Sequence, residues 1–233
     1  MKNRACKLFM MTGNSQEKGS TKTTYHIVVL GAEGVGKTAL VVRYLTRRFL
    51  SEYASTEEST YNRTVNVDDK NVQIKITDVI GKSVKQPSYV RSKIQKIDGI
   101  VVVYSVTDRR SYEAALNLLD LIRLHARPGT STPTILVGNK VDLEHIREVD
   151  ADDAEKDASE YPDCFPMESS AATLPDEAAV IFESLLKKLI NKRDSLKVPR
   201  RKVSVVLQGS PKLIRTHIKR RLSMFNKSRN GTL

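Results

Sequence analysis

The feature that most constrains this chain is a glycine-rich segment that matches the pattern G-x-x-x-x-G-K-[ST] in full, Gly31-Ala32-Glu33-Gly34-Val35-Gly36-Lys37-Thr38. An apolar run rich in β-branched residues, His26 to Leu30, precedes it, and a segment with helical spacing, Thr38 to Leu45, follows it. A strand, a glycine loop and a helix in this order direct backbone N–H groups and the positive end of the helix dipole to one point. This arrangement predicts a loop that cradles phosphate groups.

Each part of the segment has a chemical task in that interpretation. Lys37 brings a mobile cation to the outer phosphates, and the Thr38 hydroxyl can ligate Mg²⁺. We expect all eight residues and the following Ala39 to contact the nucleotide. The alternative is a glycine-rich turn with an incidental lysine. A dinucleotide-binding loop is disfavoured, because Lys37 and Thr38 stand where its third glycine would be.

A second motif, Asn139-Lys140-Val141-Asp142, follows the predicted strand Thr134–Val137 and points to the base. A carboxylate such as that of Asp142 can accept hydrogen bonds from the N1–H and the 2-amino group of guanine. Adenine has no proton on N1, so it would leave the carboxylate desolvated and unpaired, which is costly. Asn139 can serve the other edge of the base, and the Lys140 stem can cover its face. The ligand predicted from the residues is therefore GTP or GDP with Mg²⁺.

Hydrophobic periodicity predicts the fold class. Short apolar runs alternate with helical patterns, and such alternation is typical of an α/β, doubly wound, mostly parallel sheet, the P-loop NTPase fold. The expected strands are 26–30, 61–67, 72–76, 100–104, 134–137 and 164–167, and the expected helices are 38–45, 110–126, 150–160 and 177–192. Residues 68–71 form a polar turn, so 61–76 reads as a hairpin that gives this six-stranded sheet one antiparallel edge strand. On the helix 110–126 we expect Leu116, Leu119, Leu121 and Ile122 to face inward.

The net charge of +12 is concentrated at the two ends of the chain. Residues 197–233 hold eleven Lys or Arg and no acidic residue, and residues 1–22 hold five Lys or Arg and one Glu. We therefore expect a flexible basic leader at 1–23, a globular domain at 24–193 and a basic tail at 194–233. The two cysteines form no disulfide framework, and no apolar run approaches the length of a signal peptide or of a membrane span.

At this point the chain resembles the Ras family of small GTPases over about residues 24–193, and within it the subfamily of the oestrogen-regulated growth inhibitor. The segments that carry the closer likeness run from Thr38 through Arg47-Arg48-Phe49 and from Glu58 to Tyr61. The resemblance implies a GTP-hydrolysing signalling switch in which Phe49 stacks on guanine. It also implies that Thr56 and Asp78 act at Mg²⁺, that the Gly81 N–H senses the γ-phosphate, and that Ser170-Ala171 contact the base. Lys37 and the residue at position 82 are the catalytic candidates.

The chain departs from the family pattern where water would be activated. Lys82 stands in place of the glutamine that orients the attacking water, and a lysine offers no acceptor. Glu33 adds a carboxylate beside the γ-phosphate, Val79-Ile80 replace Thr-Ala, and Ala172 replaces a lysine. We therefore expect slow GTP hydrolysis. Two alternatives remain: compensation by a residue of the 83–95 segment such as Gln86 or Gln95, or a nucleotide-bound scaffold without turnover.

Partners follow from the same resemblance and from the tail. Residues 50–61 and 79–95, polar and without clear periodicity, correspond to switch loops that effector proteins contact, and an exchange factor or activating protein is also implied. If residues 211–225 are helical, Ile214, Ile218, Leu222 and Phe225 share one face of a basic amphipathic segment. We favour docking on an anionic membrane or a partner over calmodulin-like capture, nuclear import or a solvated tail. Nucleic-acid binding is not expected, because charge alone supports it.

The predicted location is cytoplasmic, peripheral at the plasma membrane or partly nuclear. The tail contains no cysteine, so we expect no prenylation.

Overall fold

A computed structural model describes residues 24–49, 58–79, 81, 83–95, 97–125, 131–173 and 175–197. The predicted leader and most of the predicted tail lie outside these residues. Residues up to Ser195 belong to one compact unit, and the described residues of the second unit are the last two of a long helix. Within the described part, no helix combines the length and apolar character needed to cross a bilayer.

A six-stranded sheet forms the centre of the compact unit, with the strand order β2-β3-β1-β4-β5-β6. Its strands are β1 (Thr24–Leu30), β2 (Ser59–Val67), β3 (Lys70–Asp78), β4 (Gly99–Ser105), β5 (Thr134–Asn139) and β6 (Cys164–Ser169). All neighbouring strands pair in parallel except β2 and β3, which pair antiparallel. The predicted fold class, with its antiparallel edge strand, is confirmed.

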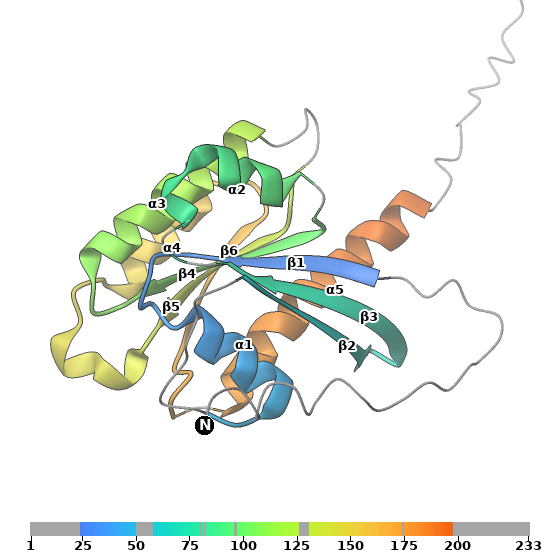
Figure 1. Cartoon of the computed structure of the whole chain (residues 1–233), viewed down its shortest axis with the longest axis horizontal. Coiled ribbons are helices and arrows are strands. Elements are labelled where there is room, and N and C mark those ends of the chain that lie inside the picture. Colours follow the sequence, from blue (N-terminus) through green and yellow to red (C-terminus); the bar gives the residue numbers. More distant parts are fainter. Residues whose placement is uncertain are drawn as a thin grey trace, which may run out of the picture. The chain divides into compact units, whose positions relative to one another are not determined.

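Helices cover both faces of the sheet (Figure 1). The helix α1 (Lys37–Thr46) and the helix α5 (Pro175–Lys197) lie on one face, and α2 (Pro87–Ile94), α3 (Arg109–His125) and α4 (Ala151–Ser159) lie on the other. Two short 3₁₀ segments, η2 (Ser83–Lys85) and η3 (Val141–Ile146), complete the described elements.

The strand β1 shows why its sequence is apolar at every position from Ile27 to Leu30. Ile27 and Val29 pack with α1 and α5, whereas Val28 and Leu30 pack with the helices of the opposite face. Because successive side chains of a strand point to opposite faces, a strand covered on both sides needs apolar residues at every position. This double burial fixes the end of β1, and with it the loop that follows, in the middle of the sheet.

The β2–β3 hairpin turns at Asp68 and Asp69, whose φ angles of 48° and 61° are both positive. Two successive left-handed residues are typical of the type I′ turn, which matches the twist of a hairpin and which Asp tolerates better than most residues. The turn sets the register that pairs Ser59 with Asp78 at the far end of the hairpin.

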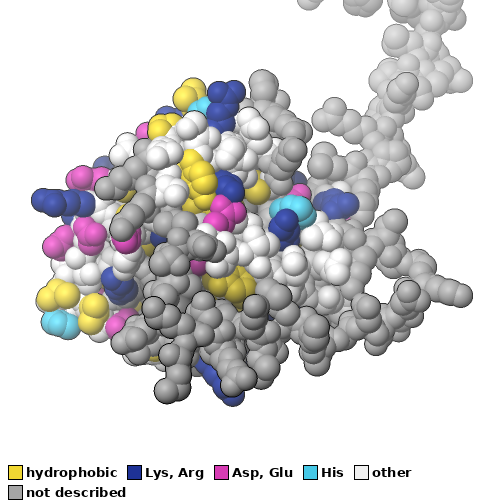
Figure 2. Space-filling model, in the orientation of Figure 1, with side chains coloured by type: hydrophobic (Ala, Val, Ile, Leu, Met, Phe, Trp, Pro, Cys, Tyr) yellow, Lys and Arg dark blue, Asp and Glu magenta, His cyan; other side chains and the backbone are white. Residues whose placement is uncertain are grey.

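Side chains of both charge signs are interspersed on the face of the molecule in Figure 2.

One expectation about the helices was wrong, and another was confirmed only in part. The 79–95 segment, for which the pattern predicts no regular structure, contains α2, an eight-residue helix with a proline in its first turn. Only Val90 of that helix is buried, so no apolar stripe announces it. On α3 the inward stripe is Tyr112, Ala115, Leu118, Leu119 and Ile122. Leu119 and Ile122 are therefore buried as expected, whereas Leu116 and Leu121 flank the stripe and pack against the same core while only partly buried.

Candidate nucleotide-binding site

Four loops that carry the predicted site residues meet at the carboxyl ends of the parallel strands. The phosphate loop follows β1, Asp78 ends β3, Asn139 ends β5, and Ser170 follows β6. Parallel strands bring their carboxyl ends to one edge of a sheet, and ligands of such folds bind there. The tertiary structure thus places residues from four separate parts of the sequence in one site.

Thr38 and Asp78 form the first contact between these loops. The Thr38 hydroxyl donates a hydrogen bond to Oδ2 of Asp78 over 2.6 Å. Asp78 lies opposite Val29 in the β1–β3 register, so the strand pairing sets the carboxylate beside the start of α1. Both predicted metal-binding groups of the described chain therefore lie together.

The chemistry of this pair suits Mg²⁺. Oδ1 of Asp78 is buried and has no hydrogen-bond partner among the described residues, so it offers an acceptor that a metal-bound water could use. Burial raises the pKa of Asp78, while the Thr38 hydroxyl and the Lys37 ammonium act in the opposite direction. The described part of the chain holds no cluster of three or more His, Cys, Asp or Glu that could hold a metal. Mg²⁺ usually keeps several waters and takes few protein ligands, so this donor set fits it.

Lys37 is a buried cation in the same corner. Its side chain is only 6% exposed, and its Nζ donates to the Ala32 carbonyl over 2.7 Å. Burial lowers the pKa of Lys37, and the nearby carboxylates of Asp78 and Glu33 partly offset this effect. A cation kept desolvated at the inner side of a glycine loop is suited to bind an anion.

Asn139 connects the phosphate loop to the base-reading loops. Its Nδ2 donates to the Val35 carbonyl over 2.8 Å, and its Oδ1 accepts the Ala171 N–H over 3.2 Å. Gly36, with a φ of 94°, lies so close that a Cβ there would come within 2.2 Å of that Nδ2. The glycine is therefore required both by its left-handed backbone and by the approach of Asn139.

Asp142 is held by Ser170, from the loop after β6. The Ser170 hydroxyl donates to Oδ1 of Asp142 over 2.5 Å. Lys140, which lies between Asn139 and Asp142 in the motif, adopts a left-handed conformation with a φ of 70°. Such a conformation is uncommon for a lysine and is found where the surroundings determine the backbone. The base motif is thus a constrained turn rather than an ordinary surface loop.

Gly81 lies directly against the phosphate loop. A Cβ at this position would meet the Glu33 backbone nitrogen at 2.4 Å, so only glycine allows the approach. Gly81, at the start of the segment that leads to α2, is thereby packed on the phosphate loop at Ala32 and Glu33. The Glu33 side chain itself is exposed.

The remaining predicted residues are only partly described. Phe49, expected to stack on the base, is 41% exposed and lies at the end of a described segment. Thr56, Ile80 and Lys82 lie outside the described residues. Gln86 precedes α2 and Gln95 follows it, and both are exposed.

Sequence reasoning missed several residues that support the base-reading loops. Arg147 donates to both carboxylate oxygens of Glu168, over 2.7 and 3.0 Å, and so joins the turn after Asp142 to the end of β6. Glu177 accepts the Ser170 N–H, and Thr173 donates twice to the Ser170 hydroxyl. No motif marks these residues, because their roles depend on contacts between separate elements.

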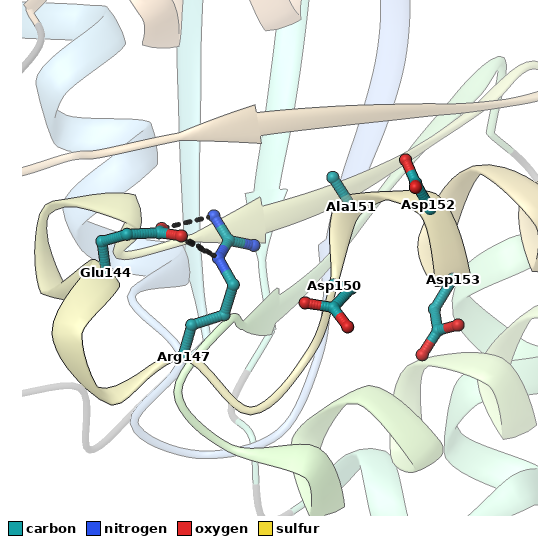
Figure 3. A pocket seen from close by; sticks show the side chains of 6 residues that line it. All are labelled: Glu144, Arg147, Asp150, Ala151, Asp152 and Asp153. Carbon is teal, nitrogen blue, oxygen red and sulfur yellow. Dashed lines mark hydrogen bonds and ion pairs between the residues drawn. The ribbon is translucent and has the colours of Figure 1, made fainter.

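A hollow of about 490 Å³ lies between η3 and α4, beside the site (Figure 3). It is lined by Glu144, Arg147, Asp150, Ala151, Asp152 and Asp153. Figure 3 shows Arg147 turned to Glu144, with which it forms an ion pair of 2.8 Å. The hollow shares no residue with the phosphate loop or with the Asn139–Asp142 motif, so we do not assign the nucleotide to it.

A doubly wound sheet with a phosphate loop after its first strand, and with a base-reading motif after its fifth, defines a P-loop nucleotide-binding protein. Comparison with protein families narrows this class. The model of the Ras family matches residues 26–191, and the chain therefore belongs to the Ras family of small GTPases. Members of that family generally bind GTP and GDP with Mg²⁺ and hydrolyse GTP.

Curated relatives agree with this assignment. The chain is 38% identical to the Ras-related and estrogen-regulated growth inhibitor of Homo sapiens over 169 residues, which is 72% of this chain and 82% of the relative. It is 36% identical to the Ras-related and estrogen-regulated growth inhibitor-like protein of Bos taurus over 168 residues, or 70% and 82% of the two chains. It is 44% identical to the Ras-like protein family member 11B of Danio rerio over 131 residues, or 54% and 53%.

Proposed function

We propose that this chain binds GDP and GTP with Mg²⁺ in the site described above and acts as a signalling switch that hydrolyses GTP slowly. The observation that carries the proposal is the meeting of the Thr38–Asp78 pair and the Asn139–Asp142 motif at one edge of the sheet. The hydrogen bond from Thr38 to Asp78 joins the phosphate loop to β3, and the hydrogen bond from Asn139 to Val35 joins the same loop to the guanine motif. In our proposal the phosphate-binding and the guanine-binding residues therefore form one site.

Each end of the nucleotide has its own residues in this proposal. The phosphate-loop amides and Lys37 bind the phosphates, and Thr38, Asp78 and the switch residue Thr56 hold Mg²⁺. When bound, the metal neutralises charge on the β- and γ-phosphate oxygens. Asp142 accepts the two guanine protons, while Asn139, Lys140, Ala171 and Phe49 contact the rest of the base.

Direct titration tests the binding part. With labelled nucleotides and Mg²⁺, we expect saturable uptake of GDP and GTP and none of ATP at the same concentration. Asp142→Asn should shift preference from guanine towards xanthine nucleotides, because the amide can donate to the xanthine oxygen where the carboxylate cannot. ATP uptake equal to that of GTP, or no saturable uptake, would refute the proposal.

Slow hydrolysis is proposed from residue chemistry. Lys82 cannot accept a hydrogen bond from the attacking water, and Glu33 adds a negative group at the part of the loop where Gly81 packs. An arginine supplied by an activating protein is worth about 10³–10⁵ in rate, and the Glu33 carboxylate would occupy the space it needs. A single-turnover assay showing ordinary intrinsic Ras-like hydrolysis would contradict this.

The alternative for the missing glutamine is Gln86 or Gln95. The placement of Gln86 before α2, five residues after Gly81, favours it over Gln95 at the other end of the helix. Gln86→Ala should lower the hydrolysis rate if this residue compensates, and should leave it unchanged under our proposal.

A nucleotide-bound scaffold without turnover is the second candidate, favoured by the replacements at positions 33, 79, 80 and 82. A switch changes the order of its effector loops with the bound nucleotide, whereas a scaffold does not. Hydrogen exchange of residues 50–61 and 79–95, compared between GDP and a GTP analogue, separates the two. Equal protection in both states would favour the scaffold.

We also propose that effector proteins, and an exchange factor or activating protein, contact residues 50–61 and 79–95. The basic tail is proposed to add weak docking on an anionic membrane or a partner, consistent with a cytoplasmic protein that is peripheral at the plasma membrane or partly nuclear. Co-sedimentation with anionic liposomes that falls with salt would support membrane docking. Preferential binding of DNA or RNA in the same salt series would contradict it.

A further inference from the structure

Ser170 donates its hydroxyl to the base-reading carboxylate of Asp142, and every hydrogen-bonding group of the Ser170 side chain is in use. It is fully buried at 0% exposure. A hydroxyl has one proton and two acceptor lone pairs. Ser170 Oγ accepts the Thr173 N–H over 3.1 Å and the Thr173 hydroxyl over 2.8 Å, which leaves its own proton for Oδ1 of Asp142.

The backbone of Ser170 is held by a separate carboxylate. Its N–H donates to Oε2 of Glu177 over 2.9 Å. Glu177 is the third residue of α5, which begins at Pro175. A glutamate at this position of a helix commonly accepts the N–H of the residue just before the helix, in a capping box. Here the carboxylate reaches further back, to the loop after β6.

The consequence is a chain of contacts that ends on the guanine-recognition group. Glu177 sets the plane of the Ser170 amide, Thr173 sets the direction of the Ser170 hydroxyl, and that hydroxyl donates to Asp142. The next amide in the loop, Ala171 N–H, is bound to Asn139. A hydrogen bond to a charged acceptor is shorter and stronger than one between neutral groups, so Glu177 is well suited to fix a buried loop.

We infer that Glu177, with Thr173, is a positioning residue for guanine recognition, acting on Asp142 through Ser170. The inference rests on the proposed function, because it assumes that Asp142 binds the guanine 2-amino group. It predicts that loss of Glu177 reduces discrimination between bases more than it reduces binding of the phosphates.

The test compares GDP with IDP, whose hypoxanthine base lacks the 2-amino group. For each variant the dissociation constants of both nucleotides are measured with Mg²⁺. The ratio of the dissociation constant of IDP to that of GDP reports the contact of the 2-amino group with Asp142. Glu177→Ala should lower this ratio about five- to tenfold, which corresponds to about 1–1.4 kcal/mol, the size of the net contribution of one ordinary hydrogen bond, because Glu177 acts on Asp142 only through Ser170. Glu177→Gln keeps an acceptor oxygen and should stay within about twofold of the wild type.

Two further variants control for the charge and for folding. Asp176→Ala removes an exposed carboxylate from the same first turn of α5 and should leave the ratio unchanged. Thr173→Val removes the hydroxyl donor at an exposed position, so it tests the same chain of contacts even if Glu177→Ala does not fold. Thr173→Val should lower the ratio about threefold. In an Asp142→Ala background neither change should alter the ratio further.

The outcomes separate this inference from the proposed function. A wild-type chain that takes up neither nucleotide overturns both. Ratios equal to the wild type in Glu177→Ala and Thr173→Val, or an equal loss of GDP and IDP affinity together with a lower melting temperature, overturn the inference alone. The last result would assign Glu177 to stability and not to base recognition.

Discussion

Tyr89 donates its hydroxyl to Oε2 of Glu58 over 2.5 Å, and so joins α2 to the residue that precedes β2. Lys93, one turn further along α2, pairs with the same carboxylate at 2.6 Å, and its ammonium lies 5.1 Å from the centre of the Tyr89 ring. Burial acts to raise the pKa of Glu58, but the hydrogen bonds from Lys93 and Tyr89 hold it below its ordinary value. These contacts couple the 50–61 segment, which contains Glu58, to the 79–95 segment, which contains Tyr89 and Lys93.

Tyr89→Phe is expected to destabilise the fold by about 1.5–3 kcal/mol, because it removes a partly buried hydrogen bond to a charged group. Urea denaturation followed by circular dichroism measures this change. Tyr161→Phe is the matched control, since the Tyr161 hydroxyl donates to Asp120 over a longer 3.2 Å at an exposed position. Equal effects of the two substitutions would mean that the contact with Glu58 adds no special stability.

Removal of Mg²⁺ is expected to speed GDP release about tenfold or more, because the Thr38–Asp78 pair would lose the ion that links it to the phosphates. Thr38→Ala should release GDP quickly whether or not EDTA is present. Thr46→Ala serves as control: Thr46 lies at the other end of α1, where its hydroxyl donates to the Val42 carbonyl over 2.8 Å. Release that is insensitive to EDTA in the wild type would argue against a metal at Asp78.

Lys82→Gln is expected to raise the single-turnover rate of GTP hydrolysis by about tenfold or more, because glutamine restores an acceptor for the attacking water. Glu33→Gly should have little effect alone but should restore sensitivity to an activating protein that supplies an arginine. Lys156→Gln, at an exposed site on α4, controls for the loss of a positive charge. A Lys82→Gln rate equal to that of the wild type would show that position 82 does not limit hydrolysis.

Arg63→Met is expected to destabilise the protein by about 1–3 kcal/mol. Arg63 of β2 donates to the carbonyls of Tyr44 and Leu45 over 3.0 and 2.9 Å, at the C-terminal end of α1, where orphan carbonyls favour a cation. Thermal unfolding measures the effect. Arg109→Met removes an exposed ion pair to Asp153 and should cost less than about 1 kcal/mol.

Cys164 is expected to resist thiol reagents in the folded protein. Burial raises the pKa of its thiol to about 11, so little thiolate forms near pH 8. In a Cys6→Ser variant, Cys164 should react slowly in buffer and fully in urea. Since the folded pKa is the higher one, the stability that this thiol contributes is complete below its unfolded pKa and falls as pH rises towards 11. Fast labelling of the native variant would mean that β6 opens readily.

Local patterns were enough to predict the architecture. The alternation of apolar runs and helical segments, and the hairpin around Asp68–Asp69, gave the six strands and the single antiparallel pair. Periodicity failed where a helix has no apolar stripe. Pro87–Ile94 buries only Val90, and it packs beside α3, so its sequence resembles that of a polar loop.

The candidate site divides in the same way. The motifs Gly31–Thr38 and Asn139–Asp142 were predicted because all residues of each motif are contiguous in the sequence. The residues that hold these motifs in place through tertiary contacts were not predicted. Glu177 and Arg147 resemble ordinary surface charges in the sequence, and only the folded chain brings them to Ser170 and Glu168.

The amino-acid sequence by itself determined the succession of strands and helices along the chain, the phosphate loop and the base motif. The reason is that backbone geometry and side-chain periodicity act over a few neighbouring residues. Only the tertiary structure decided that Asn139 donates to Val35, 104 positions away, and that Glu58 meets Tyr89. Such contacts depend on strand register and helix packing, which arise when the whole core is assembled and which no single segment encodes.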